Sequence, residues 1–337
     1  MNMHWSVLFF LFMTLGLCGC ELRPLEEAPE GVNINIKVNV KAVANVTTHV
    51  YNDKIAVPEI YPDAMHVLFY EKDGDRLLSE SFITNKQMSS EGECTMTGYV
   101  DVLPGEYKMV VYSFGAYYTS VSDYNNWSQI SARALEVSEV LGNRYKSTMA
   151  QARQVSPVVT YIPDHIVVAR SEEEIIPDHL DSYTIHAEAS TVVDTYYLQV
   201  KVDGLSYVSS ARAYLSGMAS GNIISKNEPI AVPESVLYFK MAKSEDNGEP
   251  VICALFNTFG RLEDTPNNLS ITFDMVTVDG RSESRTFDIT DLFQTELCQK
   301  YHWLLLEEKI KIEPPVSEDG FAPGVSEWEE DKHNIHL

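Results

Sequence analysis

Two cysteines, Cys18 and Cys20, stand one residue apart at the end of an almost wholly apolar run that begins at Val7. Cysteine thiols can bind a metal, exchange with a disulfide or carry a covalently attached group. A metal site would need further Cys or His ligands close by in the sequence, and none occurs there. A redox pair would more often be spaced Cys-x-x-Cys within a thioredoxin-like pattern, which the sequence lacks. The spacing therefore favours a processing site.

The residues around Cys20 resemble the bacterial lipobox, in which an aliphatic residue, a variable position and a small residue precede the cysteine that becomes acylated. Leu17 and Gly19 occupy the aliphatic and small positions. The apolar run has the length of a signal-peptide core and is shorter than the ~20 residues of a membrane span. We expect residues 1–19 to be a lipoprotein signal peptide and residues 20–30 a polar tether, held to the outer membrane by acyl chains such as palmitate on Cys20.

A plain cleaved signal peptide is the alternative, and one feature departs from the lipoprotein pattern. Residues 1–5, before the apolar run, contain no Lys or Arg, whereas signal peptides usually begin with positive charge.

A second set of residues that could do chemistry is formed by two Ile-Pro-Asp-His repeats, at 162–165 and 176–179, followed by Asp181 and His186. Imidazole and carboxylate groups suit zinc or manganese. However, the spacing is not that of ligands on one helix or hairpin, and Pro-Asp is common in turns. The sequence also contains no Gly-x-Ser-x-Gly elbow, phosphate loop or His-Glu-x-x-His motif. We therefore expect no catalytic residues, no metal site and no cofactor.

The segment 112–127, YSFGAYYTSVSDYNNW, is rich in aromatic residues and is predicted to be largely a loop. Exposed rings beside Asn and Asp are typical of sugar-binding surfaces, because flat rings stack on sugars and short polar groups bind hydroxyls. The candidate ligand-binding aromatics are Tyr117, Tyr118, Tyr124 and Trp127. The alternative is that these rings cover the end of a β-sandwich core.

The chain of 337 residues is long enough for two domains of ordinary size. Its formal net charge of −24 argues against a nucleic-acid partner, because no basic patch offsets it. Three cysteines remain beyond the signal peptide and its processing site, namely Cys94, Cys253 and Cys298. An odd number disfavours a disulfide framework, and the first two fall on the apolar side of alternating segments, so we expect buried free thiols. A Cys253–Cys298 disulfide is the alternative.

Apolar residues alternate with polar ones along most of the chain, whereas helical periodicity is scarce. Residues 32–40, VNINIKVNV, alternate without a fault and predict a half-buried strand. The Asp73-Gly74 pair, between apolar runs at 65–70 and 76–83, is typical of a tight hairpin turn. The second half repeats this pattern, with one short helix expected at 291–297. We therefore predict an all-β protein with a β-sandwich in each half.

These patterns divide the chain into successive parts. We expect an N-terminal β-sandwich at 31–155, a strand-poor connector at 156–184 and a C-terminal β-sandwich at 185–312. An acidic tail follows at 313–337. The connector is expected to lack strands because it carries Pro157, Pro163 and Pro177 together with the acidic run 172–174.

The acidic tail retains spaced large apolar residues, which are Phe321, Val325, Trp328 and Ile335. A solvated disordered tail would not usually keep such residues. A segment that packs in extended form against a sheet would keep them.

Several fragments together are similar to the fimbrillin-like lipoproteins of Bacteroidales, a group that includes fimbrial anchor and minor subunits. They are the lipobox, VLPGEYKMVVYSF at 102–114, VSSARAYLSGMASG at 208–221 and GFAPGVSEWEEDKHNI at 320–335. Glu26-Glu27 also resembles the acidic signal that sends such lipoproteins to the cell surface. The resemblance implies two tandem transthyretin-like (Greek-key) β-sandwiches. It also implies that residues 319–337 could complete a sheet of another fimbrial subunit, the alternative being an edge strand of their own domain.

The polymerising members of the wider fimbrial group carry an arginine-containing processing site before the first strands. Here Arg23 is the only arginine between Cys20 and the predicted sheet. The lipid is therefore expected to be permanent, which favours an anchor or accessory subunit over a shaft subunit. The resemblance thus implies a non-enzymatic, surface-exposed outer-membrane lipoprotein in cell adhesion, with other fimbrial subunits as partners. A glycan- or ligand-binding surface lipoprotein is the alternative.

Overall fold

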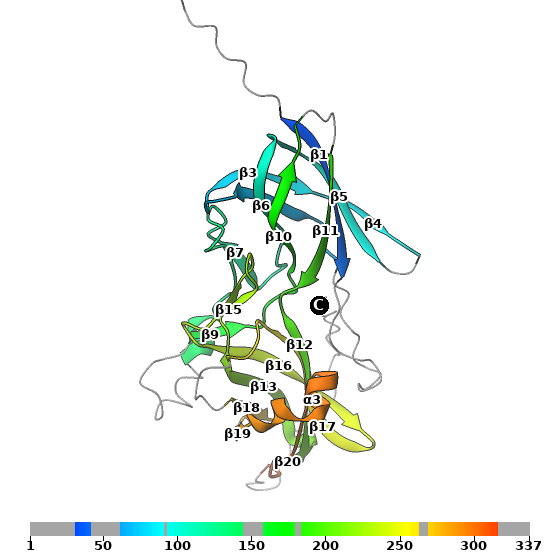
Figure 1. Cartoon of the computed structure of the whole chain (residues 1–337). Coiled ribbons are helices and arrows are strands. Elements are labelled where there is room, and N and C mark those ends of the chain that lie inside the picture. Colours follow the sequence, from blue (N-terminus) through cyan, green and yellow to red (C-terminus); the bar gives the residue numbers. More distant parts are fainter. Residues whose placement is uncertain are drawn as a thin grey trace, which may run out of the picture. The chain divides into compact units, whose positions relative to one another are not determined.

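Strands account for nearly all regular structure in the computed structural model, as the alternation of apolar and polar residues predicts (Figure 1). The structure describes residues 31–41, 61–90, 93–143, 158–178, 183–262 and 269–315. The elements below belong to one compact unit that begins at Val32. Two large sheets and one small sheet make up the fold. The predicted all-β, β-sandwich class is confirmed.

The first sheet runs in the order β3-β2-β6-β10-β11-β1-β5-β4 and encloses a core that includes Met65, Phe69 and Met109. Its strands are β1 (Val32–Lys41), β2 (Met65–Glu71), β3 (Leu77–Ile83), β4 (Asn85–Met88), β5 (Cys94–Val102), β6 (Gly105–Ser113), β10 (Val167–Ile176) and β11 (Tyr183–Thr191). Neighbouring strands are antiparallel, except that β1 and β11 pair in parallel. Serine hydroxyls of β3 donate to backbone carbonyls of β5, so the two ends of the sheet approach each other.

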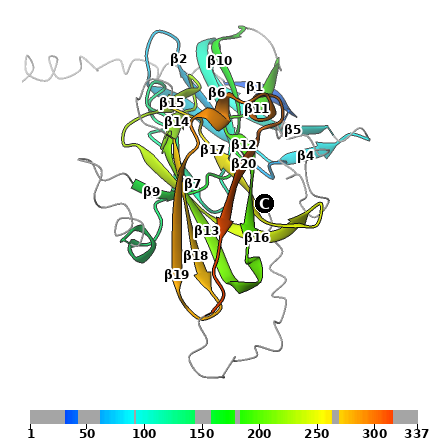
Figure 2. The same ribbon diagram turned by 90° about the horizontal axis from the view of Figure 1, so that it is seen from below.

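The second sheet runs in the order β19-β18-β13-β16-β17-β12-β20, with β9 paired to β16. Its strands are β9 (Val158–Tyr161), β12 (Asp194–Asp203), β13 (Val208–Met218), β16 (Ser235–Asp246), β17 (Glu249–Thr258), β18 (Ser270–Thr277), β19 (Ser282–Asp288) and β20 (Trp303–Lys311). The first half of β16 pairs with β13 and its second half with β17, so the sheet folds over a core that includes Leu215, Phe256 and Phe273. Figure 2 shows β13, β18 and β19 side by side.

Short helical segments accompany the second sheet. They are η2 (Leu205–Tyr207), η3 (Asp291–Gln294) and α3 (Glu296–Tyr301). The predicted helix at 291–297 is therefore a 3-10 turn followed by a short α-helix, whose first turn is capped by the Thr295 hydroxyl accepting from the Cys298 N–H.

A small third sheet joins strands from both halves of the chain. It runs in the order β15-β14-β8-β7, with β7 (Thr119–Ser122), β8 (Ser131–Ala134), β14 (Gly221–Ile223) and β15 (Glu228–Ile230). β8 and β14 pair antiparallel, so the backbone of the first half bonds directly to that of the second. A third core lies here and contains Leu68 and Val110 from the first half together with Ile224 and Phe259 from the second.

Strand β2 shows why the sequence supports two cores at this point. Apolar residues lie on both of its faces, and Met65 to Tyr70 are all buried. Val67 and Phe69 point into the first core, whereas Leu68 and Tyr70 point into the third. A strand covered on both faces loses the polar alternation of a half-exposed strand, and the run MHVLFY shows this loss.

The prediction of a strand-poor connector at 156–184 is wrong. These residues contain β9, which belongs to the second sheet, and β10, which belongs to the first. The prolines stand outside the strands, since Pro163 lies between them and Pro177 follows β10, where a missing N–H costs no sheet hydrogen bond. The acidic residues Glu172 and Glu173 occupy a bulge between the paired residues Ser171 and Glu174, an irregularity that sequence alternation does not reveal.

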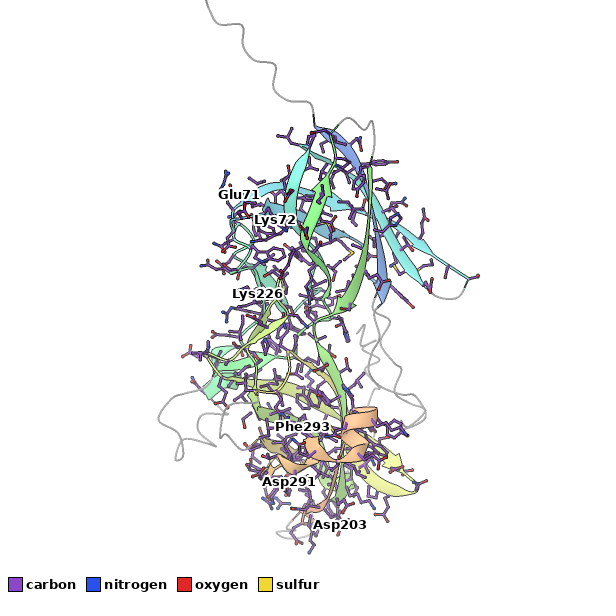
Figure 3. All side chains as sticks on the ribbon, viewed as in Figure 1. Glu71, Lys72, Asp203, Lys226, Asp291 and Phe293 are labelled. Carbon is purple, nitrogen blue, oxygen red and sulfur yellow. The ribbon has the colours of Figure 1, made fainter. Side chains whose placement is uncertain are left out.

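Lys72, from the turn that follows β2, holds this bulge in place (Figure 3). Its Nζ donates to the Glu172 carbonyl at 3.1 Å and lies 3.3 Å from the Glu173 carboxylate. The acidic run therefore has a positive partner within the first sheet rather than forming a free solvated linker.

We predict that Gly221→Ala lowers the free energy of unfolding by about 2 kcal/mol. A Cβ atom at this position would collide with the Ala132 carbonyl oxygen, because β8 and β14 approach closely there. Gly142→Ala is the matched control, since its Cβ would meet nothing nearer than 3.9 Å, and it should not destabilise the protein. Urea unfolding of both variants checks this prediction. Equal stability of the two would contradict the close approach of the strands.

Candidate functional site

Several predicted site residues lie outside the described residues. They are Leu17, Gly19 and Cys20 of the processing site and Phe321, Val325, Trp328 and Ile335 of the tail. Their roles stay predictions.

Trp127, one of the four candidate ligand-binding aromatics, belongs to the core. Its side chain is only 4 % exposed, and its ring meets that of Tyr70 edge-on at 5.5 Å. The Lys108 ammonium lies 5.7 Å from the centre of the ring. The third core contains both rings, and a buried ring presents no face to a ligand. The assignment of Trp127 to a ligand site is therefore corrected, and the alternative interpretation as a core residue holds for it.

Tyr117 and Tyr118 lie on a loop that is fixed by Asp164. One carboxylate oxygen of Asp164 accepts hydrogen bonds from the backbone N–H groups of Tyr117, Tyr118 and Thr119 at 2.9, 2.6 and 2.9 Å. The Tyr117 side chain is 68 % exposed, and the Tyr118 ring stacks on Tyr161 at 4.4 Å. These two rings are thus surface features on a well-held loop.

Tyr124 belongs to a group of rings that sequence analysis did not bring together. Its ring lies 5.9 Å from that of His66, around which Phe82, Phe114 and Tyr112 also gather, at 4.3, 6.0 and 5.4 Å. We call these five residues the His66 aromatic cluster. The imidazole is buried, whereas Phe82, Phe114 and Tyr124 are 56, 47 and 38 % exposed. The cluster therefore presents three aromatic side chains to solvent.

The buried imidazole of His66 is fully hydrogen-bonded. Nδ1 lies 2.9 Å from the Tyr112 hydroxyl, and Nε2 lies 3.0 Å from the Glu80 carboxylate. Burial lowers the pKa of His66, and the hydrogen bond and negative charge of Glu80 offset part of that effect.

One sequence signal could have revealed the cluster. In β3 the residues Leu78, Glu80 and Phe82 share the exposed face, so Phe82 stands where alternation calls for a polar residue.

The two Asp-His repeats do not converge on a metal site in the described part of the chain. Asp164 is engaged by backbone N–H groups, and His186 is exposed on β11. Asp178 is described, whereas His179 and Asp181 are not. Among the described residues there is no group of three or more His, Cys, Asp or Glu that could hold a metal ion.

His165 is instead partly buried. Its Nδ1 atom is buried and has no hydrogen-bond partner among the described residues. Burial lowers the pKa of His165 to about 4, with the nearby Asp164 charge acting in the opposite direction. The imidazole is therefore neutral at physiological pH.

A groove of about 700 Å³ lies beside η3 and α3 and is lined in part by Tyr196, Arg261, Phe293, Cys298 and His302 (Figure 3 labels Phe293). The Tyr196 ring stacks on His302 at 4.7 Å. Burial raises the pKa of Cys298 to about 11, so its thiol is not an activated nucleophile. The groove could bind a group on its surface, but the side chains named here form no nucleophile–base pair.

Cys94, Cys253 and Cys298 are all buried and free. Buried free thiols are confirmed, and the alternative Cys253–Cys298 disulfide is wrong. Burial raises the pKa of each thiol.

None of the helices in the described residues has both the length and the apolar character needed to cross a bilayer.

Comparison with known proteins identifies the relatives of the chain. The family model "Domain of unknown function (DUF5119)" matches residues 39–239. The chain is 21 % identical over 310 residues to the "Putative fimbrium anchoring subunit Fim4B" of Bacteroides ovatus. The aligned region covers 87 % of this chain and 81 % of that protein. These matches confirm the predicted resemblance to fimbrial proteins of Bacteroidales.

A solved structure shares the fold. A "putative adhesin" from Bacteroides ovatus superposes with a TM-score of 0.58 at 17 % identity, over 89 % of this chain and 99 % of that one. The fimbrial anchor protein Mfa2 from Porphyromonas gingivalis gives a TM-score of 0.45 at 13 % identity, over 83 % and 90 % of the two chains.

We predict that His165 makes the protein less stable in acid. Its pKa is lowered in the folded state. Its contribution to the free energy of unfolding is therefore complete above the pKa of 6.5 that it has in the unfolded chain, and is lost as the pH falls from 6.5 towards 4. The loss amounts to at most about 3 kcal/mol. His165→Gln should remove this part of the pH dependence of unfolding, whereas His186→Gln, on an exposed strand position, should not. Urea unfolding between pH 4 and 7 checks the difference, and parallel curves for wild type and His165→Gln would contradict it.

Proposed function

We propose that this chain, which belongs to the family "Domain of unknown function (DUF5119)", is a non-enzymatic anchoring or accessory subunit of a fimbrium and acts in adhesion at the cell surface. The observation that carries this proposal is the extent of its similarity to a fimbrium anchoring subunit, which spans most of both chains. The shared β-sandwich fold supports the proposal, because the similarity extends through both halves of the chain.

We further propose that the chain is attached to the outer membrane by acyl groups on Cys20 and faces the cell exterior. Leu17 and Gly19 would serve as the recognition residues of the peptidase. Two or more acyl chains hold a protein stably, since each buried methylene contributes about 0.8 kcal/mol. The tether of residues 20–30 would then lead from the lipid directly into β1, which starts at Val32.

The acidic tail is the proposed contact with another subunit. Its apolar residues Phe321, Val325, Trp328 and Ile335 could fill pockets along a groove of that subunit. An edge strand of its own domain is the second interpretation of the same residues.

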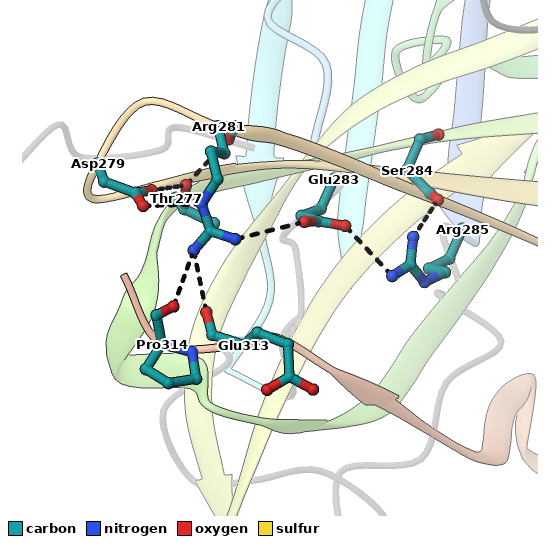
Figure 4. Close-up of polar contacts among 8 residues, drawn as sticks. All are labelled: Thr277, Asp279, Arg281, Glu283, Ser284, Arg285, Glu313 and Pro314. Atoms are coloured by element: carbon teal, nitrogen blue, oxygen red, sulfur yellow. Dashed lines mark hydrogen bonds and ion pairs between the residues drawn. The ribbon is translucent and has the colours of Figure 1, made fainter. Parts of the chain in front are cut away.

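Arg281 fixes the point at which the chain leaves the second sheet towards this tail (Figure 4). Its guanidinium donates to the carbonyl oxygens of Glu313 and Pro314 at 3.0 and 3.3 Å. The carboxylates of Asp279 and Glu283, 2.7 and 3.8 Å away, orient the guanidinium. A defined exit suits a segment that must reach a partner in a set direction.

Cys20→Ala should release the protein from the membrane, because the position that carries the lipid then has no thiol. We expect at least a tenfold loss from the outer-membrane fraction and detachment of fimbriae into the medium. Cys18→Ala is the matched control, since it changes the variable position of the lipobox and should leave the protein attached. Immunoblots of cell fractions and mass spectrometry of the mature N-terminus check this. Unaltered membrane attachment of Cys20→Ala would contradict lipid anchoring.

Deletion of residues 319–337 should leave the remaining protein folded and abolish its association with other fimbrial subunits. Co-purification with those subunits measures association, and circular dichroism with thermal unfolding reports the fold. Unfolding on deletion would instead assign the tail to an edge strand of its own domain.

A further inference from the structure

Phe82 and Phe114 of the His66 aromatic cluster are exposed, although polar side chains at these two positions would take nothing from a hydrophobic core. Phe82 and Phe114 belong to none of the hydrophobic cores of the described residues. Both rings lie against the buried His66 imidazole. Contiguous exposed aromatic groups on a stable protein indicate a contact surface.

The rings are held in fixed orientations. Phe82 stacks on His66 with 12° between the planes, and Phe114 lies within 27° of Phe82. His66 is locked by its two hydrogen bonds, and the backbone carbonyl of Tyr124 accepts from the buried Tyr70 hydroxyl at 2.8 Å. Because the rings are nearly parallel and already ordered, a ligand would lose little free energy in immobilising them.

A carboxylate lies beside the rings. Glu80 shares the exposed face of β3 with Phe82 and uses one carboxylate oxygen for His66; its other oxygen makes no hydrogen bond among the described residues. Asp123, next to Tyr124, is a second exposed carboxylate. Carboxylates accept hydrogen bonds from hydroxyl groups, and they repel anionic ligands, as does the net charge of −24.

We propose that the His66 aromatic cluster is a binding site for a neutral polysaccharide, with the apolar face of one hexose against Phe82 and Phe114 and its hydroxyls donating to Glu80. The parallel rings match the flat C–H face of a pyranose, and the carboxylates match its hydroxyls. A protein interface of ordinary size buries about 800 Å² on each partner, more than three partly exposed rings present. This site goes beyond the proposed anchoring function, which requires no sugar, so its failure would leave that function untouched.

Affinity electrophoresis of the full chain in detergent tests the proposal. Native gels would contain hydroxyethylcellulose or galactomannan as neutral polysaccharides and polygalacturonate as an anionic one. We expect retardation by at least one neutral polymer and none by polygalacturonate. The double variant Phe82→Ala/Phe114→Ala should weaken binding at least tenfold, because it removes both stacking faces.

Two further variants make the result specific. Phe82→Tyr keeps the ring and should retain binding within threefold, which separates loss of the site from loss of folding. Tyr99→Ala removes a ring that is 70 % exposed on β5 and should leave binding unchanged. Absence of retardation by both neutral polymers, or equal retardation of wild type and the double variant, would overturn the proposal. The proposal would also be overturned if the protein bound no polymer and the double variant no longer bound a fimbrial partner subunit. The surface would then be a protein contact.

Discussion

The burial of β2 on both faces is the constraint on which the rest of the structure depends. Its alternate side chains enter two different cores, one inside the first sheet and one shared with residues 219–262 of the second half. A strand in this position has no solvent-exposed face, so Met65 to Tyr70 are all buried, and the polar atoms of His66 and Tyr70 form hydrogen bonds within the protein. The shared core in turn orders the segments around Trp127 and Ile224, from which the small third sheet is built.

The alternation of apolar and polar residues predicts most individual strands, because every second side chain of a half-buried strand faces the core. It could not predict which strands pair, since β9 and β10 are neighbours in sequence yet belong to different sheets. The expectation that residues 156–184 lack strands is wrong because a proline such as Pro163 or Pro177 can mark the end of a strand as well as a region without strands. Trp127 was assigned to a ligand site because the sequence does not show that Tyr70 and Lys108 cover its ring.

The candidate surfaces depend on polar residues whose role is positional. Asp164, part of an Ile-Pro-Asp-His repeat in the sequence, orders the loop that carries Tyr117 and Tyr118. His66, which has no motif around it, orders the rings of Phe82 and Phe114. Such residues are recognised only through partners distant in sequence, as Glu80 and Tyr112 are for His66. Sequence analysis could therefore find exposed aromatic candidates but not the groups that hold them in place.

The parallel pairing of β1 with β11 has a mechanical consequence. β1 lies between β11 and β5 and is paired with the first from Ile34 to Lys41 and with the second from Val32 to Val40. The chain continues from the end of β11 into β12 of the second sheet. Tension entering at the start of β1 and leaving through the end of β11 would load the hydrogen bonds between these strands in shear, so that they must rupture together rather than one by one. Such a geometry resists sudden force far better than a peeled edge strand would.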